Sequence, residues 1–429
     1  MTLFDTLEKY LDKNFINELS EAMDCERTNS LILNTNKMSK EDFISEFPEV
    51  QKHPFMENVF YFNKKQYELG KSYLFDNGAY YIMDASSLLV AHFLPVKDGD
   101  LILDMCAAPG GKTISLALNN LDKNISIISN DISYNRTLDL SNNIEKIGLP
   151  NIAVINNDFS KNYQKFPNKF DVIILDAPCS GSAMFRKNEL AFKDWSLQKV
   201  LSLKIKQIEL LKEAIYMLNN DGYISYSTCS FSYEENEEVI LEILNEFPDI
   251  EMVNIPARKE FYKDKNLPES IHLFPNLYKG EGQFIAILHK KGAKIQNTKF
   301  KSVGIKHKDI LKKYNLDFEN EYFVKDRIYV NNIDFNFDKL NVIRYGLLVG
   351  TINKDNFVPD FNLAKHLHSS NSIELNEDEK NRYLHGEELT KNCNLHNGFY
   401  IVKYKKLNLG RVKLVNNKLK NYYPKGLRH

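Results

Sequence analysis

The chain has little of what marks secreted, membrane-bound or disulfide-stabilised proteins. It contains five cysteines in 429 residues, an odd number for a disulfide framework in so long a chain. No apolar segment follows Met1, and no run approaches the roughly 18 apolar residues that a membrane span requires. These absences predict a cytoplasmic protein with reduced thiols and no membrane partner.

Neither sign of charge predominates, because 56 Lys and Arg balance 57 Asp and Glu for a net charge of -1. Any surface that binds nucleic acid must therefore be a local patch and not a global excess of positive charge. The overall charge neither supports nor excludes RNA as a partner.

Apolar spacing divides the chain into parts. Leu3, Leu7 and Leu11 recur at helical spacing, and a mixed polar segment follows to about Leu94. Beyond residue 100, short apolar runs that end in acidic or small residues alternate with helical stretches, which is typical of a parallel sheet covered by helices. We expect an α/β fold with one doubly wound, mostly parallel sheet of seven strands. The expected strands are 101–103, 125–128, 152–155, 172–175, 223–226, 252–253 and 284–288, with a helix at 234–247.

Four parts are expected along the chain: a small N-terminal domain over 1–95, a catalytic domain over 96–290, a linker and accessory domain over 291–370, and a C-terminal domain over 371–429. Residues 401–429 contain nine Lys and Arg and no Asp or Glu, a bias that predicts contacts with RNA phosphates. A solvated basic tail around core tyrosines is the alternative. We expect this basic cluster to be separable from the sheet, so that 1–290 alone would retain the cofactor. The tyrosines suited to stacking on unpaired bases are Tyr400, Tyr404, Tyr422 and Tyr423.

The segment 104–113, with the sequence DMCAAPGGKT, follows the first expected strand and opens a helix. Its small residues let a ligand approach the backbone closely at the helix N-terminus. A Walker A loop requires glycine where Cys106 stands, and the dinucleotide pattern G-x-G-x-x-G is also absent. An NTPase and a nicotinamide-dependent dehydrogenase are thus both disfavoured. The candidate cofactor contacts in this loop are Cys106, Ala107, Ala108, Pro109, Gly110, Gly111 and Lys112.

Acidic residues end the second and third expected strands. Asp131 lies 21 residues after Gly110, close to the spacing at which a carboxylate reaches ribose hydroxyls. Asp158 is placed to accept a hydrogen bond from an adenine amine. A lone aspartate at a strand end is about as often a helix cap, but the carboxyl ends of parallel strands meet at one edge, where such sheets bind ligands. Together the two acids predict a nucleoside cofactor without adjacent phosphates.

Two cysteines follow the fourth and fifth expected strands at the same edge. The sequence DAPCSG covers 176–181 and STCS covers 227–230. A single cysteine beside a strand is more often a small buried hydrophobe. Neither cysteine belongs to a C-x-x-C pair or adjoins a pair of histidines, so no metal is expected. A redox disulfide between them is chemically possible, but it would leave the cofactor pocket unexplained.

These motifs together resemble the NSUN/RsmF family of RNA cytosine-5 methyltransferases, and the C-terminal segments are similar to its bacterial ribosomal RNA branch. The resemblance implies a Rossmann-like class I methyltransferase domain and a C-terminal PUA-like RNA-binding domain. Met83 and Asp84 depart from the family, which usually carries Gln and Glu at those positions. The matching elements are 104–113, 130–131, 157–158, 176–186, 226–236, 278–284, 344–346 and 421–428.

The resemblance also implies a reaction, the transfer of the methyl group of S-adenosyl-L-methionine to carbon 5 of a cytosine in ribosomal RNA through a covalent intermediate. Cys229 would attack the base, Cys179 would assist breakdown of the adduct, and Asp176 would bind the cytosine beside the cofactor. Arg186 and Lys187 are candidate phosphate contacts. Transfer RNA as substrate and a catalytically silent RNA-binding assembly protein are the alternatives. DNA cytosine methylation is a further one, because those enzymes place their nucleophile in a Pro-Cys motif such as 178–179.

Overall fold

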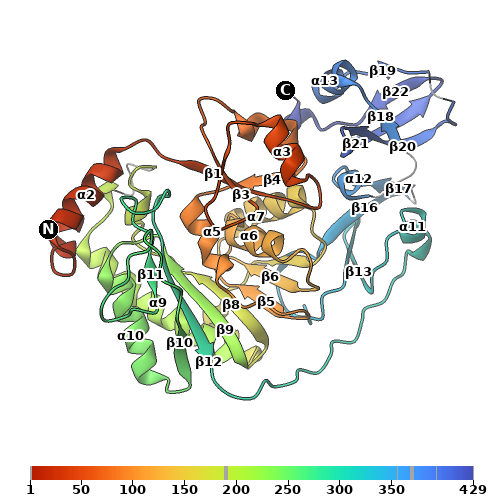
Figure 1. Ribbon diagram of the computed structural model, residues 1–429. Helices are drawn as coiled ribbons and strands as arrows, with labels where there is room; N and C mark the ends of the chain where they lie inside the picture. The colour runs from red at the N-terminus through yellow and green to blue at the C-terminus, as the bar shows by residue number, and fades with distance from the viewer. Residues whose placement is uncertain (1, 188–191, 355, 368–371, 393, 429) are drawn as a thin grey trace.

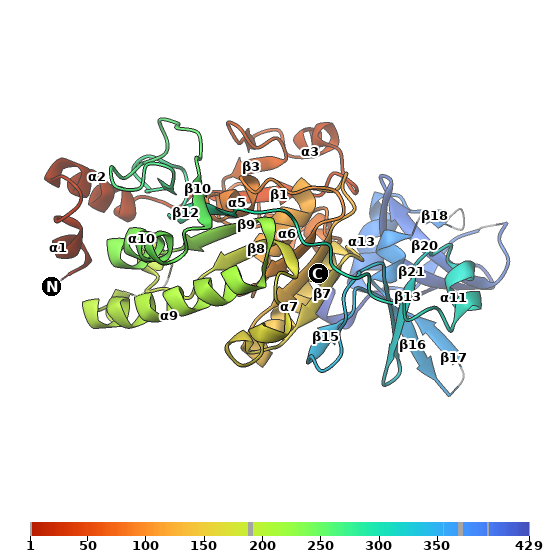
Figure 2. The same cartoon turned by 90° about the horizontal axis from the view of Figure 1, so that it is seen from below.

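The computed structural model describes residues 2–187, 192–354, 356–367, 372–392 and 394–428. A large central sheet lies between the N-terminal helices at one end of the molecule and two smaller C-terminal sheets at the other (Figures 1 and 2). A long segment after the central sheet runs along the outside of the molecule to reach the C-terminal sheets (Figure 1). Among the helices of the described ranges, none has the length and apolar character to cross a membrane.

The N-terminal part contains several short helices and a four-stranded antiparallel sheet in the order β2-β3-β1-β4. The continuous helical spacing at the start of the chain is divided in two, because Thr2 caps the first helix and Asp12 caps the second. The elements are α1 (Leu3–Leu7), α2 (Lys13–Asp24), β1 (Asn29–Leu33), α3 (Lys40–Glu46), β2 (Gln51–Lys52), β3 (Val59–Phe62), η1 (Leu69–Lys71), α4 (Tyr73–Asp76), β4 (Tyr80–Ile82) and α5 (Ala85–His92).

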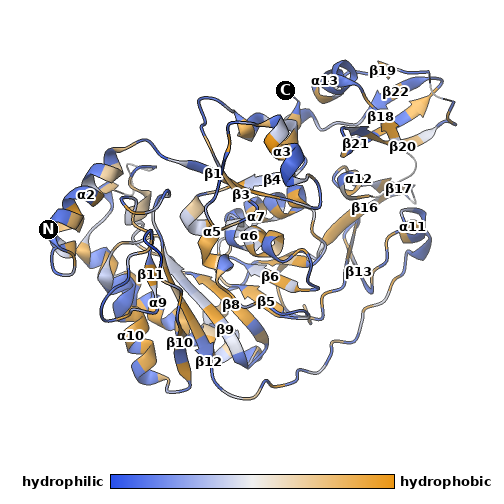
Figure 3. Ribbon diagram, viewed as in Figure 1, coloured by the Kyte–Doolittle hydropathy of each residue, from blue (hydrophilic) through white to orange (hydrophobic). Residues whose placement is uncertain are grey.

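The seven expected strands all belong to the central sheet, in the order β10-β12-β9-β8-β5-β6-β7. Strands β5 to β9 pair in parallel, whereas β12 is antiparallel to both β9 and β10. The parallel strands are buried on both faces and therefore read as continuous apolar runs (Figure 3). The expected α/β, Rossmann-like fold is confirmed. The elements are β5 (Leu101–Asp104), α6 (Gly111–Asn119), β6 (Ser126–Asn130), α7 (Tyr134–Ile147), β7 (Ile152–Ile155), η2 (Phe159–Lys161), η3 (Tyr163–Lys165), β8 (Phe170–Asp176), η4 (Ser182–Met184), α9 (Leu197–Met217), β9 (Leu218–Thr228), η5 (Tyr233–Glu235), α10 (Glu237–Glu246), β10 (Ile250–Val253) and β12 (Phe284–Lys290).

Two short strands extend this sheet beyond the expected seven. Strand β11 (Ile271–His272) pairs with β12, and β15 (Val342–Arg344), far along the chain, pairs with β7. Arg344 is 3% exposed and forms an ion pair of 3.1 Å with Glu145 of α7. The C-terminal part thus covers the edge of the catalytic sheet, which would otherwise expose unpaired backbone groups. A strand of three residues has too little periodicity to be predicted from sequence.

The rest of the chain forms two small sheets, in the orders β13-β14-β16-β17 and β18-β20-β21-β22-β19. Their elements are α11 (Lys308–Lys313), β13 (Asn320–Val324), β14 (Arg327–Asn331), β16 (Leu347–Asn353), β17 (Asn356–Pro359), α12 (Leu363–His366), β18 (Ser372–Glu374), α13 (Glu377–His385), β19 (Leu389–Thr390), β20 (Gly398–Tyr404), β21 (Leu407–Val415), β22 (Lys418–Asn421) and η6 (Lys425–Leu427).

The five-stranded C-terminal sheet shares its apolar core with the N-terminal sheet. Leu33 and Phe60 belong to the same buried cluster as Val402 of β20. The rings of Tyr73 and Tyr404 make an edge contact with centroids 5.9 Å apart. This packing argues against our expectation that the basic C-terminal part is separable, because its removal would expose an apolar face of the N-terminal sheet.

Candidate active site

The loop between β5 and α6 is shaped by two adjacent glycines. Gly110 has a φ of +109°, and a Cβ there would lie 2.8 Å from the side chain of Leu140. A Cβ on Gly111 would lie 2.9 Å from Met83, the residue at which the sequence departs from the related family. Position 110 therefore requires glycine, whereas at Gly111 the flexible end of Met83 would have to shift. The loop backbone stays close to the N-terminus of α6, where unpaired amides attract polar ligand groups.

Asp104, at the start of this loop, presents a buried carboxylate that is only half satisfied. One oxygen accepts a hydrogen bond of 2.6 Å from Thr113, and burial raises the pKa of the carboxyl to about 7. The other oxygen is buried without a hydrogen-bond partner in the described part of the chain. An orphaned acceptor of this kind fits a donor on a ligand, such as the amine of S-adenosyl-L-methionine.

Hydrogen bonds hold the middle of the loop in place. Arg136 donates to the carbonyl of Ala108, and Asn143 donates to the carbonyl of Pro109 at 2.9 Å. Cys106 packs against the core of the sheet, and burial raises the pKa of its thiol. Cys106 is therefore unsuited to act as a nucleophile, which agrees with its assignment to the cofactor loop.

Asp131 and Asp158 lie beyond the ends of β6 and β7, at the same edge of the sheet as the loop. Asp131 is 2% exposed, accepts from the amide of Ser133 and lies 3.2 Å from Arg136. Asp158 accepts from Ser160 and pairs with Lys161 at 2.9 Å. Their contacts with ribose and adenine remain predictions.

Sequence reasoning missed Ile132, which follows Asp131 and is 63% exposed. Single exposed apolar side chains are common, but this one directly follows the strand-end acid at the edge where the cofactor is expected. The packing of Ile132 on the face of a nucleobase is a prediction. The signal in the sequence was an apolar residue directly after a strand-end acid.

The two cysteines of the DAPCSG and STCS motifs meet at this edge, with their sulfur atoms 3.1 Å apart. The hydrogen bond from the Cys179 thiol, and the nearby Lys112 ammonium, lower the pKa of Cys229 against the opposing effects of burial and Asp176. The same hydrogen bond, together with burial, raises the pKa of Cys179 well above its usual value. These two shifts favour the thiolate on Cys229 and the shared proton on Cys179.

Lys112 and Asp176 form an ion pair beside the cysteines, with 2.6 Å between Nζ and Oδ2. Burial disfavours the charge of Lys112, but the attraction of Asp176 and Cys229 raises its pKa above the usual value. The other oxygen of Asp176 accepts from Ser227 at 2.7 Å and from Gln283 at 2.9 Å. Lys112 thus faces the nucleophile as well as the cofactor loop.

Glu235, which sequence reasoning did not single out, supports the loops that carry both cysteines. Its buried carboxylate accepts hydrogen bonds from the amide and hydroxyl of Ser180 and from the hydroxyl of Ser230. Gln207 of α9 donates to it at 3.0 Å. Because Ser180 follows Cys179 and Ser230 follows Cys229, one carboxylate fixes the spacing of the two thiols.

The hairpin 278–284 contacts the site through Gln283. Its contacts with Arg186 bear on the predicted phosphate contact of that residue. Arg186 donates to the carboxylate of Glu281 at 3.1 Å and to the carbonyls of Gly280 and Ala22, so it serves as a structural link and not as a phosphate contact. Lys187 is exposed, and its proposed phosphate contact remains a prediction. Asp84 caps α5 and accepts from the amide of Glu281.

Comparison with known proteins identifies the chain. The sequence model described as 16S rRNA methyltransferase RsmB/F matches residues 91–289, and the one described as methyltransferase RsmF PUA domain matches residues 370–429. Ribosomal RNA small subunit methyltransferase F of Shewanella piezotolerans is 30% identical over 93% of this chain and 90% of its own length. The protein of the same name from Vibrio parahaemolyticus is 29% identical over 93% and 91%.

Among solved structures, the methyltransferase homologue from Pyrococcus horikoshii aligns with a TM-score of 0.59 and 26% identity over 67% of this chain and 93% of that one. NSun6 from the same organism, solved with SFG, aligns with a TM-score of 0.61 and 21% identity over 68% and 98%. Fold and site together define an S-adenosyl-L-methionine-dependent methyltransferase of the Rossmann-like class I type.

The chain belongs to the RsmB/F family of 16S rRNA methyltransferases. It is thus an RNA cytosine-5 methyltransferase, and the resemblance seen in the sequence is confirmed. Within the described residues, no group of three or more His, Cys, Asp or Glu is arranged to hold a metal ion.

Proposed function

We propose that this enzyme methylates carbon 5 of a cytosine in small-subunit ribosomal RNA, and that Cys229 forms a covalent bond to the base during the reaction. The observation that carries the mechanism is the thiol pair with sulfur atoms 3.1 Å apart, in which the pKa of Cys229 is lowered and that of Cys179 is raised. The relatives named ribosomal RNA small subunit methyltransferase F, aligned over 93% of the chain, support the substrate.

The chemistry begins with the weak reactivity of cytosine. The Cys229 thiolate adds to carbon 6, and the electron pair that this addition releases makes carbon 5 nucleophilic. S-adenosyl-L-methionine would supply the methyl group that carbon 5 accepts, with S-adenosyl-L-homocysteine as the leaving group. A base then removes the proton from carbon 5, and the bond between Cys229 and carbon 6 breaks to release the thiolate.

Three neighbours of Cys229 have separate tasks in this proposal. Asp176 accepts from the exocyclic amine or protonated nitrogen 3 of the cytosine. Lys112 stabilises negative charge both on the thiolate and on the activated base, since it lies between Asp176 and Cys229. Cys179, which carries the proton of the pair, assists breakdown of the adduct. A paired cytosine hides carbon 6, so the base must enter unpaired or flipped.

The cofactor occupies the loop of β5 and α6 in the same proposal. The backbone of 106–111 approaches it closely, and the free oxygen of Asp104 accepts from its amine. Asp131 binds the ribose hydroxyls, Asp158 the adenine amine, and Ile132 covers the face of the base. The division of the chain into four domains, 1–95, 96–290, 291–370 and 371–429, is also part of this proposal.

The aromatic residues expected to contact RNA are not all at the surface. Tyr404 and Tyr423 are buried, whereas Tyr422 is 40% exposed and lies beside Phe399, which is 47% exposed. The Arg411 guanidinium lies 5.2 Å from the Tyr422 ring and 5.5 Å from the Phe399 ring. Two of its nitrogens are buried without a hydrogen-bond partner in the described ranges. We propose this group, and not the buried tyrosines, as the stacking surface of the PUA-like domain.

The substrate can be tested by incubating the purified enzyme with labelled S-adenosyl-L-methionine and naked 16S rRNA, assembled small subunits or transfer RNA. Bisulfite sequencing of the products should place a new 5-methylcytosine in 16S rRNA, and the comparison of naked RNA with subunits identifies the natural substrate. Methylation of transfer RNA alone would overturn the ribosomal assignment. Binding without turnover on any RNA would instead support a silent assembly protein.

A further inference from the structure

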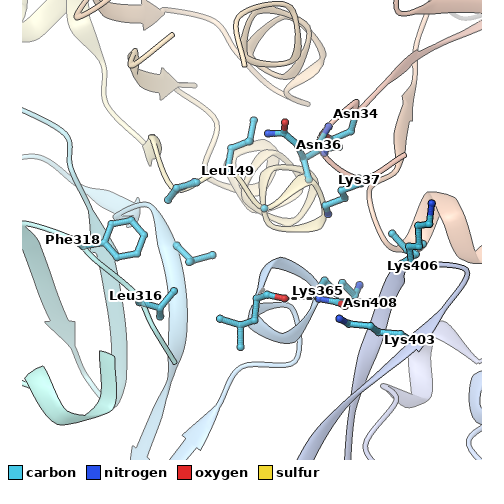
Figure 4. A pocket seen from close by; sticks show the side chains of 16 residues that line it. Asn34, Asn36, Lys37, Leu149, Leu316, Phe318, Lys365, Lys403, Lys406 and Asn408 are labelled. Carbon is cyan, nitrogen blue, oxygen red and sulfur yellow. Dashed lines mark hydrogen bonds between the residues drawn. The ribbon is translucent and has the colours of Figure 1, made fainter. Parts of the chain in front are cut away.

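A cavity of about 320 Å³ lies where the N-terminal sheet, α7 and both C-terminal sheets meet, and it shares no residue with the active site described above. Figure 4 shows that its lining has two ends. Lysines gather at one end, and Leu316 and Phe318 lie at the other. The lysines are Lys37, Lys365, Lys403 and Lys406.

The charges of this pocket are all of one sign, because none of the described residues that line it is acidic. Two of these lysines donate hydrogen bonds to backbone carbonyls. Lys37 donates to the carbonyl of Asn77 at 2.6 Å, and Lys365 donates to the carbonyl of Asp76 at 2.7 Å. Lys37 also donates to the carbonyl of Lys146 at 3.5 Å. An ammonium group has three donors, so each of these two lysines retains at least one N–H group for a ligand.

The lysine end is electrostatically strained as it stands. Lys365 is 5% exposed, and burial lowers its pKa to about 8, although Asp76 partly offsets this effect. Burial, together with the positive charge of Lys365, also lowers the pKa of Lys37. Two further carboxylates, Glu145 and Asp360, also act on Lys365, but Glu145 is already paired with Arg344. A bound anion would relieve this repulsion.

We propose that this junction pocket binds one nucleotide of the RNA substrate at a distance along the strand from the methylated base. The phosphate contacts the lysine end, and the base or sugar packs on Phe318 and Leu316. This inference rests on the proposed function in ribosomal RNA. The volume of the pocket lies at the small end of the range of about 300 to 1,000 Å³ for ligand pockets, which suits a single nucleotide.

The position of the pocket favours an RNA strand over a free nucleotide. Lys406 is exposed at the rim, on the turn between β20 and β21, whereas neighbouring Lys405 is paired with Glu46 of α3 at 2.9 Å. A strand that leaves the pocket therefore passes the exposed ammonium of Lys406. A nucleotide held there would also tie together four elements of the fold, which would fix the PUA-like domain relative to the catalytic sheet.

Binding of a fluorescently labelled single-stranded RNA to the full-length enzyme tests the proposal. Lys406→Gln, at an exposed position, should weaken RNA binding several-fold and lower the slope of log affinity against log salt by about one. Phe318→Leu keeps apolar volume but removes the aromatic face, so it should weaken binding without changing that slope. Lys365→Gln should act as Lys406→Gln does, provided that its unfolding temperature is unchanged.

Lys64→Gln is the matched control, because Lys64 is an exposed lysine of the N-terminal part that does not line the cavity. All variants should bind S-adenosyl-L-methionine as the wild type does, which verifies folding. Equal RNA affinity and salt slope for Lys406→Gln and Lys64→Gln would overturn the pocket. Adenosine monophosphate and inorganic phosphate serve as competitors. If Lys406→Gln weakens the binding of either compound but leaves RNA affinity unchanged, the pocket binds a free nucleotide or phosphate. The RNA assignment would then be wrong.

The failure of this inference differs from the failure of the proposed function. A wild-type enzyme that neither binds nor methylates RNA would remove the proposed function itself. A wild-type enzyme that does both, with pocket variants equal to the control, would remove only the pocket.

Discussion

The hydrogen bond and the charges around the two cysteines at the catalytic edge give these residues different pKa values and therefore different roles. Cys179 and Cys229 are chemically identical, yet the hydrogen bond between them moves their pKa values in opposite directions, and Lys112 further lowers the pKa of Cys229. Sequence alone could place both thiols at one edge, because each follows a parallel strand. It could not tell them apart without the family resemblance, since the distinguishing charge comes from Lys112 on another element.

The first prediction concerns the reactivity of the Cys229 thiol. Because the hydrogen bond from Cys179 is the largest effect that lowers its pKa, Cys179→Ala should raise that pKa. Alkylation of Cys229 by iodoacetamide, followed by mass spectrometry over a pH series, should then need a higher pH. The alkylation rate at neutral pH should fall about tenfold for each unit by which the pKa of the thiol rises. Lys112→Met should move the profile in the same direction by less. An unchanged profile in Cys179→Ala would disprove the assigned proton position.

A second prediction tests the cofactor site at Asp131. Asp131→Ala should weaken S-adenosyl-L-methionine binding by about 1 to 3 kcal/mol, the range for hydrogen bonds that involve a buried charge. Calorimetric titration measures this loss. Asp139→Ala, an exposed acid on α7, is the control and should bind the cofactor normally. Equal affinity in the two variants would exclude Asp131 from the site.

At the scale of elements, the closing hairpin depends on one glycine. Gly282 has a φ of +122°, and a Cβ there would lie 2.4 Å from the Phe231 ring. The hairpin also presents Gln283 to Asp176, so its position matters for the site. Gly282→Ala should lower the free energy of unfolding by more than about 1 kcal/mol and reduce kcat. Gly426→Ala meets no atom within 4 Å and serves as the control in urea unfolding. Equal stability of both variants would contradict the steric argument.

The elements of the central sheet were predictable because buried parallel strands read as short apolar runs between helical stretches. The strand-end motifs could be placed with them, since each strand end defines a position on one edge. Glu235 and Gln283 could not be found in this way. Most of their hydrogen-bond partners are distant in sequence. Acidic residues are common near the start of a helix, so the residue type of Glu235 alone does not indicate a role in the site.

For the whole molecule, the shared core of the N-terminal and C-terminal sheets sets the limits of what can be removed. Strand β15 depended on a long-range pairing that no local pattern encodes, and the shared cluster of Leu33 and Val402 was equally hidden. The sequence predicted a separable C-terminal part because composition changes sharply there, but composition says nothing about packing.

A prediction at this scale follows from the shared core. The shortened chain 1–290 should aggregate or lose cooperative unfolding, because it lacks β15 and exposes the apolar face that Val402 and its neighbours cover. Gel filtration and thermal unfolding with S-adenosyl-L-methionine measure this. A soluble monomer with the melting temperature and cofactor affinity of the full chain would show that the contact is dispensable.

The central claim, that Cys229 is the nucleophile and Cys179 resolves the adduct, is tested most directly by trapping the covalent intermediate. A labelled RNA that contains the target cytosine is incubated with cofactor and each variant, then resolved by denaturing electrophoresis under reducing and non-reducing conditions. Cys179→Ala should accumulate a protein–RNA adduct that resists reduction, because attack and methyl transfer proceed while elimination stalls. Cys229→Ala should form no adduct and no methylated product. An adduct with Cys229→Ala, and none with Cys179→Ala, would contradict the assignment.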